Sequence, residues 1–366
     1  MAWAQSLPGA ARLNLAQSGV SDVVADDTPW PEFNDALSTA PLCDRGPSGR
    51  QIHTEFLAAV ARRYDVTPNE VVPSLGASLS IMHTLMALVR PGDRVLVEQP
   101  AYEALYRAPA VLGAEIVRIP RRATHRWQID PDELEGLLTE NTKCVLLTNL
   151  HNPSGMLLER SLLEDIGERC AKRGVFVLVD EVYLDFVFDI DEKSCAVPAT
   201  KVLETGISWS SSTKCFGVSA ARAGWIVTQH KAALAAIKDA SRYLHVEVPV
   251  ATSLLGHRVL THADALTARA RRHSEAGLKT VEAWTEKELR VLWNRPDHGL
   301  CGVLQLPRGT DAMSFVDELL ANHGTLVVPG DLFECPGTVR LGFGCPTAEL
   351  EEGLGTISAA LDALKR

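Results

Sequence analysis

The sequence contains no apolar run approaching the roughly 20 residues that a membrane-spanning helix needs. Its opening residues, MAWAQSLPGAARLNLAQ, also lack the basic cluster and following apolar block that mark a secretory signal. Neither a membrane anchor nor an export signal is predicted. We therefore expect a cytoplasmic protein that has no membrane partner.

Positive charge is scarce as well. Lysine and arginine number 36 against 46 acidic residues, which gives a formal net charge of −10. Nucleic-acid binding normally needs a basic face, so no nucleic-acid partner is predicted. None of the eight cysteines stands in a C-x-x-C pair, and the histidines show no metal-ligand spacing. We expect reduced thiols and no metal site.

What the sequence does have is a regular alternation of helical patterns with short, continuous apolar runs. Such runs suit strands that are buried on both faces of a parallel sheet. The alternation predicts a doubly wound α/β domain. The strands expected are RVLVE at 94–98, EIVRI at 115–119, KCVLLTN at 143–149, VFVLVD at 175–180, and two more at 206–209 and 223–228.

The 366 residues are too many for one small core, so a large domain with a smaller companion is predicted. Residues 1–45 are rich in Pro, Asp and Ser and are interpreted as an arm that belongs to the small domain. Residues 46–250 form the predicted large domain and 251–366 the small α+β domain. A long helix around 263–287 and strands at 302–307, 325–329 and 339–344 are expected in the latter, with no flexible linker near 245–260.

Polar residues follow several of these strands at the point where each strand ends. In an open α/β sheet, ligands bind at the carboxyl ends of the strands, so we expect these residues to meet along one edge. The groups are Gly76-Ala77-Ser78, Asn149 to Gly155 (NLHNPSG), Asp180-Glu181-Val182-Tyr183, and Ser211-Ser212-Thr213-Lys214.

Each group also has a simpler interpretation when it is taken alone. A carboxylate such as Asp180 can cap a helix, N-P-S-G is a common turn, and a lysine such as Lys214 in a serine-rich loop is usually solvated. Gly76-Ala77-Ser78 is also explained as a plain helix N-cap that binds no ligand. Their joint order and spacing favour a common site, because chance seldom produces that combination.

The order of these motifs resembles the class I/II aminotransferases, a family of fold-type I pyridoxal-phosphate enzymes. The resemblance covers about residues 45–345, and its most specific part is Lys214 with Arg222 eight positions later. It implies a mainly parallel seven-stranded sheet in the large domain and pyridoxal 5′-phosphate as the cofactor. The matching stretches are GASLSIMHTLMALVRPGDRVLVEQPAYEALY, TNLHNPSG, DEVY, SSSTKCFGVSAARAGW and VVPGDLF…VRLGFG.

The resemblance assigns the reacting end of the cofactor to four residues. Lys214 is expected to form a Schiff base with the cofactor aldehyde and, once released, to move protons at the substrate. Asp180 is expected to keep the pyridine nitrogen protonated, so that the ring can accept electrons. Asn152 and Tyr183 match the residues that donate to the anionic ring oxygen. Lys214, Asp180 and Tyr183 are therefore the predicted catalytic residues.

The same resemblance predicts a binding site for the cofactor phosphate and an aromatic residue that stacks on the cofactor ring. Backbone amides at a helix start, hydroxyl groups and one guanidinium would hold the phosphate. Tyr102 matches the aromatic residue that stacks on the pyridine face, although plain core packing also explains a tyrosine there. The predicted phosphate-binding residues are Gly76, Ala77, Ser78, Ser211, Thr213 and Arg222.

Arg340, in VRLGFG, matches the arginine that binds the α-carboxylate of the substrate, and Asn152 is expected to assist it. A planar guanidinium suits a carboxylate better than an ammonium does. Holding the carboxylate in the ring plane presents the Cα–H bond for cleavage. This arrangement favours transamination or elimination over decarboxylation. The alternative for Arg340 is a surface salt bridge.

The sequence departs from the family pattern in the arm. Relatives usually carry a tyrosine about five residues before the glycine that matches Gly49, and it reaches the phosphate of the partner subunit's cofactor. Here the stretch is CDRGPSG, in which Arg45 either replaces that donor or is a solvated arm residue. The stretch Ser219-Ala220-Ala221-Arg222 also lacks a glycine that relatives often place before the arginine. No second arginine is evident for a dicarboxylate side chain.

Three functions compete. The leading prediction is an aminotransferase that moves an amino group between an L-amino acid and a 2-oxo acid. The runner-up is a pyridoxal-phosphate lyase or cyclase on the same scaffold, because the local motifs serve both. A non-catalytic regulator is disfavoured, since the resemblance begins near Leu13 and leaves no room for a DNA-binding domain. The expected partners are small amino acids and oxo acids and, by analogy with the family, a second copy in a C2 homodimer.

Overall fold

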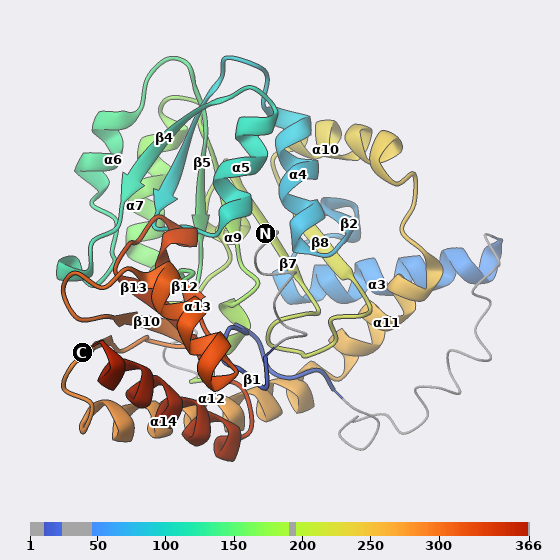
Figure 1. The fold of residues 1–366 in the computed structure, drawn as a ribbon. Helices are drawn as coiled ribbons and strands as arrows, with labels where there is room; N and C mark the ends of the chain where they lie inside the picture. The colour runs from blue at the N-terminus through green and yellow to red at the C-terminus, as the bar shows by residue number, and fades with distance from the viewer. Residues whose placement is uncertain (1–10, 24–45, 190–194, 365–366) are drawn as a thin grey trace.

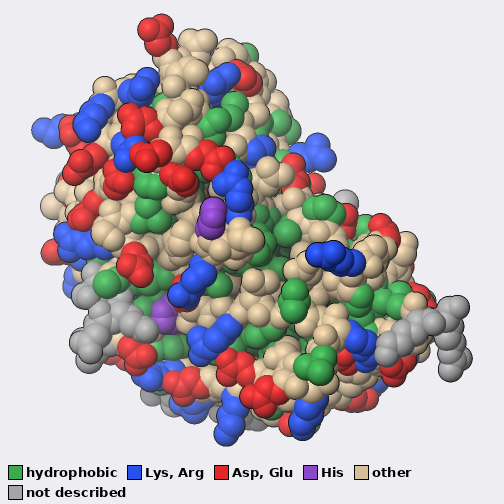
Figure 2. Space-filling model, turned by 90° about the vertical axis from the view of Figure 1, so that its left-hand side faces the viewer, with side chains coloured by type: hydrophobic (Ala, Val, Ile, Leu, Met, Phe, Trp, Pro, Cys, Tyr) green, Lys and Arg blue, Asp and Glu red, His purple; other side chains and the backbone are tan. Residues whose placement is uncertain are grey.

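The computed structural model describes residues 11–23, 46–189 and 195–364. A central sheet has helices on both faces, and the C-terminal elements, drawn in orange and red, form a smaller body beside one end of it (Figure 1). On the face shown in Figure 2, acidic and basic side chains are interspersed over the described residues.

The central sheet has seven strands in the order β2-β8-β7-β6-β5-β3-β4. β8 runs antiparallel to both of its neighbours, and the other adjacent pairs are parallel. The predicted mainly parallel seven-stranded sheet is thus confirmed. Its strands are β2 (Val71–Leu75), β3 (Arg94–Gln99), β4 (Glu115–Pro120), β5 (Thr142–Thr148), β6 (Phe176–Asp180), β7 (Gly206–Ser211) and β8 (Ala223–Val227).

Helices cover both faces because successive strand residues point to opposite sides of the sheet. Leu146 joins a core with α4, α5 and α10, whereas its neighbour Leu147 joins a core with α6, α7 and α9. The helices of this part are α3 (Pro47–Tyr64), α4 (Ala77–Leu88), α5 (Glu103–Val111), α6 (Pro131–Leu137), α7 (Arg160–Ala171), α9 (Ala199–Val202), α10 (Lys231–Leu244) and α11 (Val250–Thr261).

The C-terminal part is an α+β layer with its own core, in which Phe315, Leu341 and Leu354 are almost fully buried. Its four-stranded sheet has the order β12-β13-β10-β9. Its elements are α12 (Ala263–Thr285), β9 (Leu292–Asn294), β10 (Cys301–Gln305), α13 (Ala312–His323), β11 (Thr325–Leu326), β12 (Val328–Pro329), β13 (Thr338–Gly342) and α14 (Thr347–Ala363).

The run at 325–329, expected as one strand, is divided between two sheets. β11 pairs in parallel with the N-terminal strand β1 (Leu13–Asn14), whereas β12 pairs with β13. The chain therefore ties its N-terminal segment to the C-terminal layer through β11. The proposed domain limits, 1–45, 46–250 and 251–366, stay a prediction. α11 begins at the proposed limit, at Val250, and packs against α3 and β8.

Candidate active site

A cavity of about 530 Å³ opens at the carboxyl ends of β5, β6 and β7. All the predicted site residues except Gly76 line it, so the structure brings together the groups that the strand-end argument selected. The cavity is also lined by residues of the N-terminal segment that the sequence did not single out. These are Ala16, Gln17, Ser18, Gly19, Val20, Ser21 and Asp22.

Asp180 ends β6 with its side chain almost fully buried. Its Oδ1 accepts a hydrogen bond from the amide of Val182 at 3.2 Å. Burial raises the pKa of the Asp180 carboxyl to about 6, although the Val182 amide and the charge of Lys214 act in the opposite direction. A cationic group beside this carboxylate would bring its pKa back down. The site therefore favours a ligand that presents a protonated nitrogen at Asp180.

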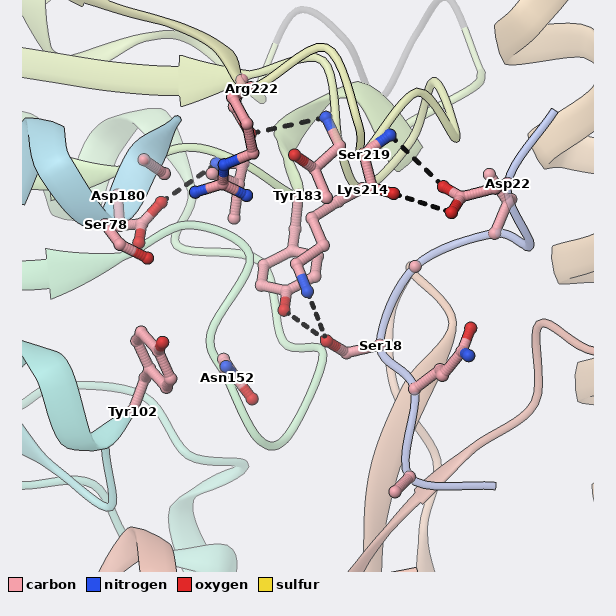
Figure 3. A pocket seen from close by; sticks show the side chains of 18 of the residues that line it. Ser18, Asp22, Ser78, Tyr102, Asn152, Asp180, Tyr183, Lys214, Ser219 and Arg222 are labelled. Carbon is pink, nitrogen blue, oxygen red and sulfur yellow. Dashed lines mark hydrogen bonds between the residues drawn. The ribbon is translucent and has the colours of Figure 1, made fainter. Parts of the chain in front are cut away.

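Lys214 lies in the loop that follows β7 and extends its amine into the cavity (Figure 3). Its Nζ donates to Ser18 Oγ at 3.1 Å and lies 5.8 Å from the ring centroid of Tyr183. Burial lowers the pKa of the Lys214 ammonium to about 8, and the positive charge of Arg340 acts in the same direction. A substantial fraction of the amine is therefore neutral near pH 8, as a nucleophile or proton acceptor must be.

The loop that carries Asn152 is held rigidly. The side-chain amide of Asn149 donates to the carbonyl of Leu158 and accepts from its amide, each at 3.0 Å. His151 is fully buried, and its Nε2 lies 2.9 Å from the carbonyl of Pro100. Burial holds the pKa of His151 well below its usual value, so the ring is neutral and Nε2–H donates to Pro100. These contacts fix where Asn152 enters the cavity.

Arg340, on β13, is fixed from two sides. Its Nη1 donates to Asn152 Oδ1 at 3.0 Å and its Nη2 to the carbonyl of Ala16 at 2.7 Å. The guanidinium carbon lies 5.0 Å from the ring centroid of Phe333. Its buried Nε has no partner among the described residues. Because Asn152 Oδ1 already accepts from Arg340, the Nδ2 of Asn152 remains as a donor for a ligand.

The first turn of α4 forms the other end of the cavity. Its N-cap, Gly76, has φ 78°, and a Cβ added there would lie 2.6 Å from Nη2 of Arg222. Gly76 therefore lets the arginine approach the start of the helix, where Ala77 and Ser78 line the cavity and the first backbone amides have no partner within the helix. Arg222 itself has φ 48°, a strained value of the kind that clusters at functional sites.

The remaining predicted residues border the same space. Ser211 ends β7, and its hydroxyl accepts from the amide of Thr213 at 3.4 Å. Tyr102 is the N-cap of α5, where burial raises the pKa of its hydroxyl and a hydrogen bond with Ser78 opposes that shift. The hydroxyl of Tyr183 lies 2.7 Å from Ser18 Oγ. Burial raises the pKa of the Tyr183 phenol well above its usual range.

Several expectations concern features away from the cavity. Arg45 lies outside the described residues, so both of its interpretations, a replacement for the arm tyrosine and a solvated arm residue, stay open. The described cysteines are free thiols, of which Cys144, Cys170, Cys215 and Cys301 are buried. Among the described residues no group of three or more histidine, cysteine or acidic side chains could hold a metal ion. Within the same part of the chain, no helix is long and apolar enough to cross a membrane.

The chain belongs to the aminotransferase class I and II family, whose model matches residues 45–357. It is 31% identical to the capreomycidine synthase of Streptomyces vinaceus, over 83% of this chain and 78% of that protein. A PLP-dependent aminotransferase from Streptococcus suis superposes with a TM-score of 0.90 at 27% identity, covering 100% of this chain and 97% of the other. The PLP-dependent cyclase OrfR does so with a TM-score of 0.84 at 28% identity, covering 99% and 96%.

Membership of this family confirms the predicted fold type and implies pyridoxal phosphate as the cofactor. The chemistry of the cavity fits that group. Lys214 provides an amine for the aldehyde, and Asp180 provides a buried carboxylate for the ring nitrogen. Ala77 and Ser78 at the start of α4, together with the guanidinium of Arg222, provide donors for the phosphate.

Proposed function

We propose that this protein is a pyridoxal-phosphate-dependent aminotransferase that moves an amino group between an L-amino acid and a 2-oxo acid. The observation that carries the proposal is the amine of Lys214, whose pKa is lowered to about 8 in a cavity that also holds Asp180 and Arg340. A proton-transferring amine, a carboxylate for the ring nitrogen and a carboxylate-binding arginine are the groups that this reaction needs.

The bound cofactor supplies an electron sink next to the Cα of the amino acid. Lys214 would bind the cofactor covalently and, when it is freed, would move the proton from Cα of the amino acid to C4′ of the cofactor. Asp180 keeps a proton on the ring nitrogen. Arg340 holds the α-carboxylate of the substrate, and the free Nδ2 of Asn152 together with the hydroxyl of Tyr183 donates to the ring oxygen.

The phosphate is bound at the first turn of α4 in this proposal. Ala77 and Ser78 of this turn line the cavity, the first amides of a helix have no partner within the helix, and the helix dipole favours an anion. Tyr102, which lines the same cavity, packs against the face of the ring. The other phosphate donors are the side chains of Ser78, Ser211, Thr213 and Arg222, and Gly76 leaves room for the last of them.

Replacing Arg340 by lysine is expected to raise the KM for the amino acid about 10-fold to 100-fold, because a paired, planar hydrogen bond to the carboxylate is lost. The kcat should fall much less. Steady-state kinetics separate the two constants. Arg269→Lys is the matched control: Arg269 is as buried as Arg340, but it donates to the carbonyl of Ser21 and does not line the cavity. An unchanged KM in Arg340→Lys would remove the carboxylate-binding role.

A lyase or cyclase is the second candidate function. Two proteins similar to this chain over most of its length, the capreomycidine synthase and the PLP-dependent cyclase OrfR, are not named as transaminases. The residues placed in the cavity serve both reactions, since each begins with proton removal at Cα. The substrate's side chain decides between them when it carries a leaving group.

The experiment that separates the two is incubation of the reconstituted enzyme with a panel of L-amino acids and no oxo acid. Transamination should give one 2-oxo acid per active site and then stop until an oxo acid is added. Elimination should release ammonia, and cyclisation a ring product, through many turnovers without any oxo acid. Lys214→Ala is the negative control for every substrate, since it lacks the amine on which all of these reactions depend.

The proposal includes a homodimer, which is the usual state of the family that the chain resembles. Light scattering should then give twice the 39.7 kDa mass of one chain. A protein that stays at the mass of one chain when the cofactor is bound would contradict this. The cytoplasmic location expected from the sequence also stays a prediction.

A further inference from the structure

Ser18 is a cavity residue that neither the sequence motifs nor the proposed roles include. Its hydroxyl accepts a hydrogen bond from the Lys214 amine at 3.1 Å and lies 2.7 Å from the hydroxyl of Tyr183 (Figure 3). The residue is only 5% exposed. One buried hydroxyl therefore joins the amine of Lys214 to the phenol of Tyr183.

Backbone contacts on both sides hold Ser18 in place. Before it, the carbonyl of Ala16 accepts from Nη2 of Arg340 at 2.7 Å. After it, the amide of Val20 donates to the carbonyl of Lys214 at 3.1 Å. A Cβ on Gly19 would lie only 3.0 Å from that same carbonyl oxygen, so a glycine permits this close approach. The hydroxyl of Ser18 is thus fixed relative to the residue whose amine it binds.

The directions of the hydrogen bonds follow from the chemistry of the three groups. An amine or ammonium donates, so Ser18 Oγ accepts from Lys214. The phenol of Tyr183 keeps its proton, because burial raises its pKa well above the usual range. If Tyr183 donates that proton to the ring oxygen of the cofactor, the hydroxyl of Ser18 must donate to Tyr183. Ser18 then orients both groups at once.

We propose that Ser18 is a positioning residue that holds the freed amine of Lys214 in the place from which it transfers protons at Cα. The assignment rests on the proposed function, in which Lys214 is the proton-transferring group. A lysine side chain has four rotatable methylene groups, and its amine is free to turn about the last bond. A hydrogen bond to a fixed hydroxyl removes much of that freedom. A misplacement of about 1 Å is enough to slow a catalytic step about 100-fold.

The first test uses the protein without cofactor and measures the pKa of Lys214 itself. Trace labelling with acetic anhydride at a series of pH values, quantified on the Lys214 peptide by mass spectrometry, gives this pKa. Ser18→Ala removes an acceptor that stabilises the charged ammonium, so the pKa of Lys214 should fall by about half a unit to one unit. Ser18→Thr keeps the hydroxyl and should keep the pKa near that of the wild type.

Ser219→Ala is the matched control. The hydroxyl of Ser219 donates to Asp22 Oδ2 at 2.7 Å and so anchors the same N-terminal segment to the Lys214 loop. The substitution is chemically identical to Ser18→Ala but removes no contact with the amine. It should leave the pKa of Lys214 unchanged. An equal fall in both variants would mean that segment docking alone matters, and it would overturn the proposal.

The second test is kinetic. In the reconstituted enzyme, Ser18→Ala should lower kcat about 10-fold to 100-fold with little change in KM, because the substrate still binds but the proton is transferred from a less ordered amine. Ser18→Thr should recover most of the loss. If Ser18→Ala leaves both the pKa of Lys214 and kcat at wild-type values, Ser18 does not position the amine.

The two tests separate this inference from the proposed function. A wild-type protein that converts no amino acid, but whose Lys214 pKa responds to Ser18→Ala and not to Ser219→Ala, would support the contact and overturn the aminotransferase. Should Ser18→Ala not fold, as judged by circular dichroism, Ser18→Cys replaces it, because a thiol is only a weak hydrogen-bond acceptor. The pKa of Lys214 should then fall in Ser18→Cys and stay near the wild-type value in Ser18→Thr. An unchanged pKa in both variants would overturn the proposal.

Discussion

Lys214→Ala is expected to lower the turnover rate about 10⁴-fold or more, because a single amine both binds the cofactor and moves the proton. No other lysine lines the cavity among the described residues, so no second amine can replace it. The variant should still bind the cofactor weakly through the phosphate end, because the α4 amides and Arg222 are untouched. Amino-acid kinetics and equilibrium dialysis of the cofactor measure the two effects.

Covalent attachment gives an independent check on the same residue. Borohydride reduction of the wild-type holoenzyme should leave the cofactor on the Lys214 peptide, and the variant should carry no such mass. Lys238→Ala is the matched control, because Lys238 donates to the carbonyl of Asn69 away from the cavity. Wild-type protein that stays colourless and unlabelled after reconstitution would contradict the cofactor assignment.

The sheet and the main residues of the site could be predicted because their signals are local. The buried strands β5 and β6 are continuous apolar runs, and side chains that follow such strands in a parallel sheet must meet at one edge. That rule alone placed Asp180 and Lys214 in the same cavity. Their roles came from the resemblance to a family, since a strand-end carboxylate by itself does not reveal what it binds.

Ser18 could not be predicted because its contacts are not local. It reaches the site only when the N-terminal segment pairs with β11 and crosses the loop of Lys214, about 200 residues further along the chain. A small polar residue among LNLAQSG carries no charge or periodicity that would set it apart. Only the three-dimensional course of that segment shows its position.

The buried ion pair of Glu98 and Arg121 is a second feature that could not be predicted from the sequence. Both side chains are fully buried, and Nη1 of Arg121 donates to Glu98 Oε2 at 2.7 Å. Charged residues are rarely buried unless they are paired, so the sequence favours exposure for each one taken alone. The pairing arises because β3 and β4 are parallel neighbours, with Gln99 opposite Pro120, so that residues near their carboxyl ends meet. Glu98 also helps to raise the pKa of Asp180.

Asp180→Asn should separate activity from stability, because the two are expected to move in opposite directions. The kcat should fall about 100-fold to 1,000-fold, since a neutral amide no longer stabilises the protonated ring nitrogen while negative charge develops on the ring. Stopped-flow measurement of proton removal at Cα, with deuterated and ordinary substrate, should show that this step has slowed. Full activity in the variant would remove Asp180 from its assigned role.

The stability of the cofactor-free protein should rise in the same variant at neutral pH. The folded-state pKa of Asp180 is raised to about 6 from an ordinary value of 3.8, chiefly by burial. A raised pKa means that ionised Asp180 costs stability above pH 6, and that this cost disappears as the pH falls towards 4. The cost is of the order of 1–3 kcal/mol, so urea unfolding near pH 7.5 should favour the asparagine variant, and unfolding near pH 4 should not.

Glu181→Gln is the control that makes this comparison decisive. Glu181 is the next residue, is equally buried, and has a pKa raised to about 8 by burial. Its Oε1 accepts from the amide of Ala199 and the hydroxyl of Ser208, which a glutamine oxygen can also do, and it does not line the cavity. Glu181→Gln should therefore gain stability at neutral pH and keep its kcat. A buried carboxylate that costs stability, but whose removal lowers kcat strongly, is a group retained for its chemistry. Of these two residues, only Asp180 should show both effects.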